Sequence, residues 1–184
     1  VIGNSCGSVT SSAVDVITNT ATAVVTQPES ITVCEGNNAV YSITANGIGL
    51  TYQWQISTDN GNNWSSVGVG TSGGTTPNLT VLSAMSSMNS YKYRVIINGV
   101  CGNVTSNIAI LTVNTPARIT VQPVSSAVIC SGSTTTLSVT ATGTGNVYQW
   151  YNDAGAIGGE ITNSYVASVS GNYYVIVSGT CNAI

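Results

Sequence analysis

Hydrophobic and polar residues alternate in short runs along the whole chain. Clear examples are the runs 51–56, 91–97 and 136–141, which are separated by clusters of Gly and Asn. Alternation with a period of two is typical of a strand with one buried face, and Gly and Asn favour turns. We find no convincing helical period longer than about two turns. The pattern therefore predicts an all-β protein whose strands have the spacing of a sandwich.

The sequence also repeats itself. Cys34 recurs as Cys130 and Trp54 recurs as Trp150, both 96 residues later, and the segment 97–101 recurs as 177–181. The second copy is therefore about 16 residues shorter, and the first copy has the segment 57–76 in that place. A repeat of this size indicates an array of similar structural units.

Each copy carries a Trp thirteen residues after a predicted core position of an earlier strand, as in Tyr41 and Trp54. A Tyr-x-aliphatic pattern follows late in each copy. Together these features are typical of an immunoglobulin-like β-sandwich, although the usual cystine between the two sheets is absent. The predicted core residues, some of which take the place of that cystine, are Tyr41, Trp54, Val95, Leu137, Trp150 and Val175.

Three units follow from the alignment of the copies. Residues 1–18 match the end of the first copy and are expected to be the C-terminal strand or strands of a preceding Ig-like repeat. Residues 19–114 form the first predicted Ig-like domain, and residues 115–184 form the second, whose last strand is missing. The chain thus has the organisation expected of a fragment of a multi-repeat array. In the alternative, residues 1–18 of one chain complete the second domain of another chain by strand donation.

Composition narrows the possible functions. Charged residues make up 5% of the chain, against about 25% in an average protein, and the net charge is −3. There is no His, which excludes Ser-His-Asp and Cys-His catalysis and an imidazole metal ligand. Three basic residues are too few to bind nucleic acid or an anionic membrane surface. No apolar run approaches the roughly 18 residues of a membrane span.

The chain has five cysteines. Two of them precede a predicted second strand and two follow a predicted late strand. We expect both places to lie near the same end of a sandwich, which predicts the disulfides Cys34–Cys101 and Cys130–Cys181. The fifth, Cys6, is expected to bond to a cysteine upstream of residue 1. Free buried thiols are the alternative. Disulfides imply an exported protein.

One motif resembles the Asp-box of sialidases, with the pattern S-x-D-x-G-x-x-W formed by Ser57, Asp59, Gly61 and Trp64. The pattern predicts a structural hairpin in which Asp59 binds backbone N–H groups, Gly61 has a positive φ and Trp64 packs back. The box occurs once, and few basic residues are available to hold a sialate carboxylate.

The other candidate sites also have ordinary structural explanations. A Ca²⁺ ion at Asp59 would have a single carboxylate and poor affinity. Trp64 with Tyr52 or Tyr151 would make a sugar-stacking platform, but surface aromatics covering a sandwich face explain them as well. The six acidic residues are scattered over three repeats, as solvated loop residues are, so a glycosidase pair is not indicated.

Several segments resemble the tandem Ig-like repeats of giant Bacteroidota cell-surface proteins, which include gliding-motility adhesins and other type IX secretion cargo. The segments that carry this resemblance are 34–39, 52–64, 84–95 and 98–102. The resemblance covers nearly the whole chain and is looser in the second copy. It implies a cell-surface stalk, filament or adhesin and supplies no catalytic residues.

We therefore expect a non-enzymatic structural segment of a large exported adhesin or filament, located outside the cell. Rigid, disulfide-closed repeats in series would hold a distal tip away from the cell. The alternative is a carbohydrate-binding accessory module of a secreted enzyme. The expected partners are neighbouring repeats of the same chain, with other copies in a fibre and a surface or glycan ligand as further options. We expect no nucleic acid, no membrane insertion, no metal and no cofactor.

Overall fold

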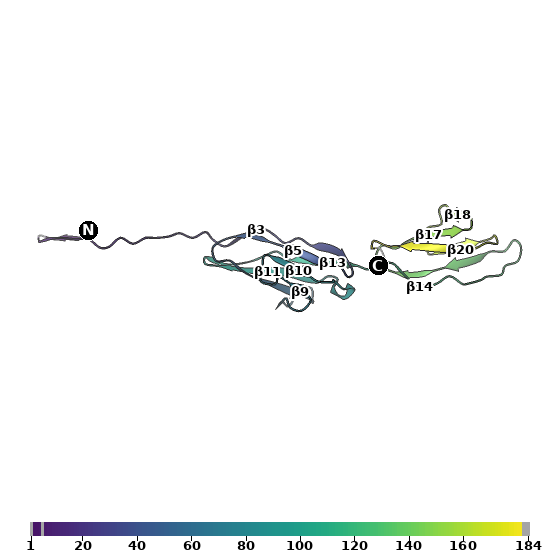
Figure 1. The fold of residues 1–184 in the computed structure, drawn as a ribbon, viewed down its shortest axis with the longest axis horizontal. Coiled ribbons are helices and arrows are strands. Elements are labelled where there is room, and N and C mark those ends of the chain that lie inside the picture. The colour runs from purple at the N-terminus through teal and green to yellow at the C-terminus, as the bar shows by residue number, and fades with distance from the viewer. Residues whose placement is uncertain (1, 5, 182–184) are drawn as a thin grey trace.

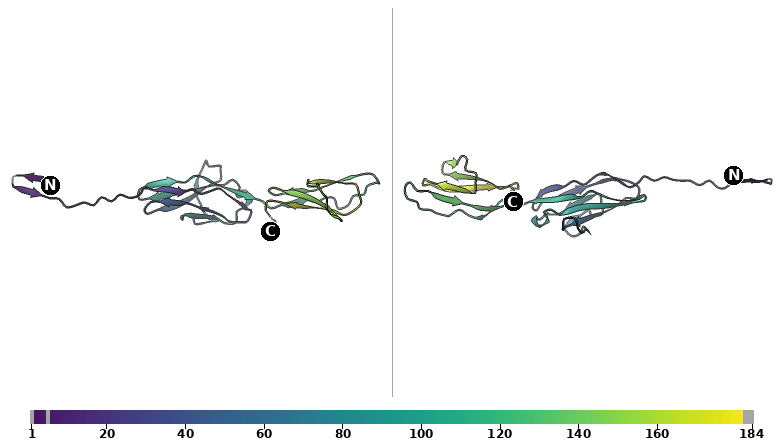
Figure 2. Two further views of the ribbon diagram at one scale, coloured as in Figure 1. Left: turned by 90° about the horizontal axis from the view of Figure 1, so that it is seen from above. Right: turned by 180° about the vertical axis from the view of Figure 1, so that it is seen from behind.

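The computed structural model describes residues 2–4 and 6–181, and the predicted all-β immunoglobulin-like class is confirmed. Two sandwiches follow one another along the long axis, and an N-terminal hairpin lies at the end of an extended segment (Figure 1). Two further views show the same end-to-end arrangement (Figure 2). Residues 1, 5 and 182–184, which belong to the outer predicted units, lie outside the described residues.

The first sandwich contains eleven strands and one 3-10 turn. They are β3 (Ala23–Thr26), β4 (Ile31–Cys34), β5 (Ala39–Ser42), β6 (Thr44–Asn46), β7 (Thr51–Ser57), β8 (Ser65–Ser66), β9 (Thr71–Ser72), β10 (Asn78–Val81), η1 (Ser86–Met88), β11 (Lys92–Gly99), β12 (Gly102–Thr105) and β13 (Ala109–Asn114).

These strands form two facing layers. One layer has the order β4-β13-β11-β7-β8, with β12 paired to β11, and the other contains β5-β10-β9 together with the pair β3-β6. The strands β4 and β13 are parallel, whereas β11 is antiparallel to both β7 and β13. Strands β4 and β13 therefore end at one end of the sandwich, and β11 ends at the other.

Alternation along the strands builds the core of the first sandwich. In β5 and β11 every second side chain is buried, as expected for strands with one face on the core. Trp54 is fully buried, and its ring centroid lies 6.2 Å from that of Tyr41. The indole N–H of Trp54 donates to the carbonyl O of Thr76 at 2.9 Å, which satisfies its only polar group.

The second sandwich is smaller. Its strands are β14 (Arg118–Val121), β15 (Thr135–Ser138), β16 (Thr140–Thr142), β17 (Val147–Asn152), β18 (Gly155–Ala156), β19 (Ser164–Ala167) and β20 (Tyr173–Ser178). They pair as β14-β16, β15-β19 and β18-β17-β20, so that β20 is an edge strand of its sheet within the described part of the chain. Trp150 is fully buried at its centre, and its indole N–H donates to the carbonyl O of Thr162 at 3.0 Å.

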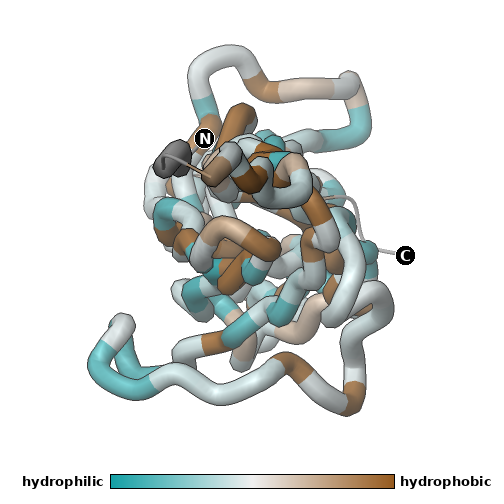
Figure 3. Tube along the Cα trace, turned by 90° about the vertical axis from the view of Figure 1, so that its left-hand side faces the viewer, coloured by the Kyte–Doolittle hydropathy of each residue, from teal (hydrophilic) through white to brown (hydrophobic). Residues whose placement is uncertain are grey.

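The two hydrophobic cores differ in how fully their equivalent residues are buried. Val95 on β11 is fully buried, and it has a backbone neighbour on each side: Trp54 of β7 pairs with it, and Ser106, between β12 and β13, exchanges hydrogen bonds with its backbone. The equivalent Val175 on β20 is half-buried, since this strand has a neighbour on one side. Leu137 is 8% exposed. Figure 3, which looks along the long axis, shows hydrophobic and hydrophilic residues interspersed around the molecule.

The N-terminal segment begins with a hairpin of β1 (Ile2–Asn4) and β2 (Gly7–Val9), whose register pairs Asn4 with Gly7. In the first sandwich, Gly99 pairs with Gly102 in the hairpin of β11 and β12. The two hairpins therefore have the same register at aligned positions of the repeat. Residues 10–22 then run as an extended segment to β3.

Candidate functional site

At the joint between the two sandwiches, hydrogen bonds, a disulfide and a charge interaction connect residues of both sandwiches. Residues 115–117 link β13 to β14 and are half-buried against turns of the second sandwich. The backbone N–H of Thr115 donates to the hydroxyl of Thr144 at 3.0 Å, and the N–H of Thr144 donates to the carbonyl of Thr115 at 2.9 Å. Gly143 has a φ of 131°, and a Cβ there would lie 2.7 Å from the carbonyl O of Pro116. The linker therefore lies against the second sandwich too closely for any side chain at this glycine.

A disulfide crosses this joint. Cys34, at the end of β4 in the first sandwich, is bonded to Cys181, which follows β20 in the second sandwich. Their Cα atoms are 5.8 Å apart, within the usual range for a cystine. The Sγ of Cys181 lies 3.7 Å from the carbonyl O of Asn114, which also accepts the N–H of Glu35 at 2.8 Å. The bond thus lies over the last residue of β13, directly before the linker.

This bond corrects the predicted pairs Cys34–Cys101 and Cys130–Cys181. The prediction placed the start of the second strand and the end of the late strand at the same end of a sandwich. In the structure β4 ends beside Asn114, whereas β11 runs antiparallel to β13 and ends at the opposite end. Cys34 and Cys101 therefore lie at opposite ends of one sandwich. Cys34 instead meets the cysteine of the next sandwich.

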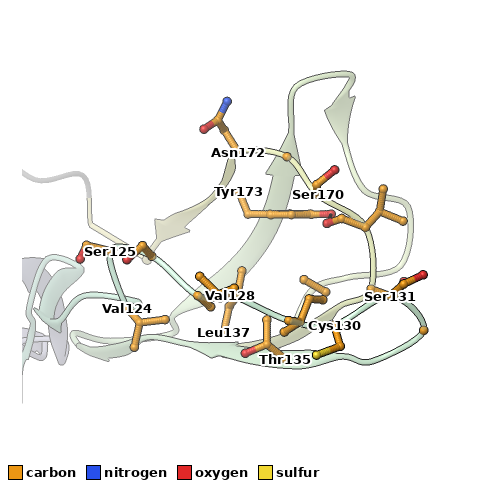
Figure 4. Close-up of a pocket in the computed structure, with 18 residues that line it drawn as sticks. Val124, Ser125, Val128, Cys130, Ser131, Thr135, Leu137, Ser170, Asn172 and Tyr173 are labelled. Carbon is orange, nitrogen blue, oxygen red and sulfur yellow. Dashed lines mark hydrogen bonds between the residues drawn. The ribbon is translucent and has the colours of Figure 1, made fainter.

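Cys101 and Cys130 are exposed and form no disulfide within the described residues. Cys101 lies in the turn between β11 and β12 of the first sandwich. Cys130 lies at the end of the second sandwich that faces away from the joint (Figure 4). Cys6 lies in the turn between β1 and β2, at the position that aligns with Cys101.

An electrostatic interaction between Glu35 and Arg118 also connects the two sandwiches. Glu35 accepts the backbone N–H of Ser86 at 2.9 Å, and hydrogen bonds from Ser86 hold the pKa of the Glu35 carboxyl below its ordinary value. The positive charge of Arg118 in the second sandwich lowers it further, as a smaller contribution. Arg118 is exposed and Glu35 is half-buried, and interactions between charges at the surface stabilise weakly.

The Asp-box segment forms a closed network of hydrogen bonds in the first sandwich. Asp59 accepts the hydroxyl of Ser57 at 2.8 Å and the backbone N–H of Asn63 at 2.9 Å. Gly61 has a φ of 98°, and its N–H donates to the Ser57 hydroxyl. Trp64 donates to the carbonyl of Gly61 at 3.1 Å. The carboxylate is engaged in holding the turn, which is a structural role.

This network makes the hairpin sensitive to acid. Hydrogen bonds from Asn63 and Ser57 lower the pKa of Asp59 from 3.8 to about 2. Because the folded pKa lies below the ordinary value, the stabilisation is complete above pH 3.8 and is lost as the pH falls through about 2. An NMR titration of the Asp59 carboxyl carbon should give a midpoint near 2. Asp59→Asn should abolish the transition of neighbouring amides, whereas a midpoint at the ordinary value would contradict the network.

The aromatic side chains considered for sugar stacking have other neighbours. Arg94 lies over the ring of Trp64, with its Cζ 4.1 Å from the ring centroid, in the first sandwich. Tyr52 is half-buried against the core of the same sandwich. Tyr151 stacks on Tyr174 of the second sandwich, with centroids 4.9 Å apart and an interplanar angle of 8°. Tyr151 therefore belongs to a pair of its own and forms no platform with Trp64.

The described residues contain no cluster of three or more His, Cys, Asp or Glu side chains placed to hold a metal ion. They also contain no helix of the length and hydrophobicity needed to cross a membrane.

A groove of about 720 Å³ opens on the second sandwich. It lies between the segment 124–132 and the strands β15, β19 and β20, and its lining includes Leu137 and Tyr173 (Figure 4). Segment 127–130 aligns with β4 of the first sandwich, where β13 lies between β4 and β11. The groove therefore occupies the place that β13 takes in the first sandwich, and Cys130 is among its lining residues.

Comparison with solved structures defines the class as tandem immunoglobulin-like domains. The titin I-band fragment I67–I69 superposes with a TM-score of 0.68 at 17% identity, covering 91% of this chain and 63% of that chain. Extracellular domains 3–5 of Drosophila OTK give a TM-score of 0.60 at 16% identity, covering 86% and 57%. The four N-terminal Ig domains of Dscam1 isoform 6.9 give a TM-score of 0.58 at 16% identity, covering 91% of this chain and 44% of that chain. The chain thus spans less than two-thirds of each of these structures, and the likeness concerns the fold.

Residues 23–115, about half of the chain, match a family described as "Domain of unknown function (DUF8696)". The chain belongs to this family. The match covers the first sandwich from β3 to the linker. A comparison with curated proteins finds no significant match.

Sequence reasoning missed the residues that build the joint. Thr115, Thr144 and Gly143 look like ordinary loop residues in the sequence, and nothing in their spacing relates them to Cys34. The sequence held no signal for the partner of Cys34, because the direction of β4 relative to β11 follows from the pairing of both strands with β13.

Proposed function

We propose that this chain is a non-enzymatic structural segment of a large exported cell-surface adhesin or filament. Its Ig-like repeats would stand in series and hold a distal part of the protein away from the cell. The resemblance of the sequence to Bacteroidota surface repeats supports this proposal, and it makes type IX secretion the expected export route. The Cys34–Cys181 bond favours an oxidising compartment.

The observation that carries the proposal is the covalent bond across the joint. Neighbouring Ig-like domains joined by a peptide linker alone are free to bend by default. Here the chain passes from one sandwich to the next through the linker, and the disulfide adds a second connection beside it. Two connections at one joint restrict bending and twisting. The linker contains no Gly, and Pro116 restricts the conformation of Thr115.

Small-angle scattering tests the spacer. The oxidised chain should give an elongated envelope that is unchanged by EDTA, because the joint is held by a disulfide and hydrogen bonds rather than by a metal. Cys34→Ser should widen the distribution of maximum dimensions, since one of the two connections is lost. Cys130→Ser, which removes an exposed thiol outside the joint, is the matched control and should leave the curve unchanged. A compact envelope of the oxidised chain, or collapse on chelation, would contradict the proposal.

A further inference from the structure

The outer end of the first sandwich is the end that faces away from the joint. It resembles the joint in the turn that carries its cysteine and in the contact of one glycine. At the joint, Thr180 N–H donates to the Thr144 carbonyl at 2.8 Å, and Cys181 follows directly. At the outer end, Val100 N–H donates to the Ile48 carbonyl at 2.9 Å, and Cys101 follows directly. The residue before Cys101 therefore makes the same backbone hydrogen bond as the residue before Cys181.

The glycines of the two ends agree as well. Gly47, which aligns with Gly143, has a φ of 147°, and a Cβ there would lie 3.4 Å from the Cα of Thr22. Gly143 approaches Ala117 in the same way, at 2.8 Å. Thr22 aligns with Ala117, so the residue before β3 approaches its glycine as the linker does at the joint, although less closely. The outer end therefore shares a turn hydrogen bond and a glycine contact with the side of the joint that the second sandwich provides.

The far end of the second sandwich resembles the side of the joint that the first sandwich provides. The N–H of Asn37 donates to the carbonyl of Cys34 at 3.0 Å, and the N–H of Ser133 donates to that of Cys130 at 3.0 Å. The following glycines, Gly36 and Gly132, have φ values of 87° and 80°. The turn that presents Cys34 to Cys181 therefore recurs around Cys130, which is exposed.

We infer that the Cys34–Cys181 bond is one step of a repeating ladder. In this ladder the cysteine before the second strand of each repeat bonds to the cysteine after the late strand of the next repeat. Cys130 would bond to the Cys101 equivalent of a following repeat, and Cys101 to the Cys34 equivalent of a preceding repeat. The partner at each end is another Ig-like repeat of this type, so the inference rests on the proposed serial array.

Each bond forms from two thiols, which lose two protons and two electrons. A disulfide oxidant of the exported compartment accepts them and is reduced to a dithiol. The exposure of Cys101 and Cys130 leaves both sulfurs accessible to such an oxidant and to a partner cysteine.

The ladder would make the array nearly inextensible. From Cys101 to Cys130 the chain consists of β12, β13, the linker, β14 and the extended segment that follows it. These strands are already close to their full length, since a strand rises about 3.3 Å per residue and a fully extended chain reaches about 3.6 Å. Tension would run along these segments and the disulfides, and the remaining strands of each sandwich would lie outside its path.

A tandem fusion tests the ladder. Placing residues 10–184 directly after Ile184 keeps the register of the repeat, because Ile184 aligns with Val104 and Thr10 aligns with Thr105. Non-reducing peptide mapping should find Cys130 of the first copy bonded to Cys101 of the second copy. Cys101→Ser in the second copy should leave Cys130 open to alkylation. Alkylation of both cysteines in the unsubstituted fusion, with Cys34–Cys181 intact in each copy, would overturn the ladder and leave the spacer proposal standing.

A second measurement uses the chain without fusion. A Cys130→Ser chain and a Cys101→Ser chain are mixed in a buffer of reduced and oxidised glutathione. If the two ends are complementary, disulfide-linked heterodimers should exceed either homodimer by at least tenfold. A statistical mixture of homodimers and heterodimers would overturn the ladder. Loss of the Cys34–Cys181 bond in every chain would count against the proposed function instead.

Discussion

Pulling the oxidised chain by its two ends should release almost no hidden length, whereas the reduced chain should lengthen by up to about 500 Å. The disulfide joins residues 147 apart, and an extended chain spans about 3.3–3.6 Å per residue. In the oxidised chain tension passes from β3 and β4 across the bond to Cys181, which leaves both cores out of its path. Strands β3 and β4 are already extended and contribute little length.

Single-molecule force spectroscopy measures this difference directly. Cys34→Ser and reduction of the native chain should both restore two unfolding events, one for each sandwich. Cys130→Ser should behave as the oxidised native chain does, because this cysteine takes no part in the bond. Two full unfolding events in the oxidised chain would show that the bond does not shield the sandwiches.

Trp54→Ala should lower the free energy of unfolding of the first sandwich by about 3–5 kcal/mol. Trp54 is fully buried among Tyr41 and the core strands. Its removal leaves a large cavity and also leaves the Thr76 carbonyl without the indole donor. Denaturant unfolding followed by circular dichroism gives the change, and the second sandwich should keep its own transition.

Trp64→Ala is the matched control, because it removes the same side chain from the surface hairpin. Trp64 is half-buried and interacts with Arg94 by a cation–π contact, which is worth about 0.5–1 kcal/mol at an exposed site. The decrease in the free energy of unfolding should therefore be several-fold smaller for Trp64→Ala than for Trp54→Ala. Equal losses for the two substitutions would contradict the distinction between core and hairpin.

Local sequence patterns predicted much of the fold. Alternation in runs such as 91–97 predicted strands because a half-buried strand must alternate, and β11 covers most of that run. The spacing of Trp54 and Trp150 indicated the immunoglobulin-like class, which the solved neighbours confirm. The hairpin at Asp59 was equally local, since its carboxylate, hydroxyl and amide partners lie within six residues of one another.

The partner of Cys34 was not a local property. Residue types and repeat spacing indicated correctly that Cys34 and Cys181 take part in disulfides, because both recur at fixed places in the repeat. They could not say which end of a sandwich each cysteine occupies. That depends on the direction of β4, β11 and β13, which is set by pairing between strands far apart in the sequence. Only the end-to-end arrangement of two sandwiches brings Cys34 and Cys181, which are 147 residues apart, within bonding distance. The structure therefore has one bond across the joint where the sequence predicted two bonds within domains.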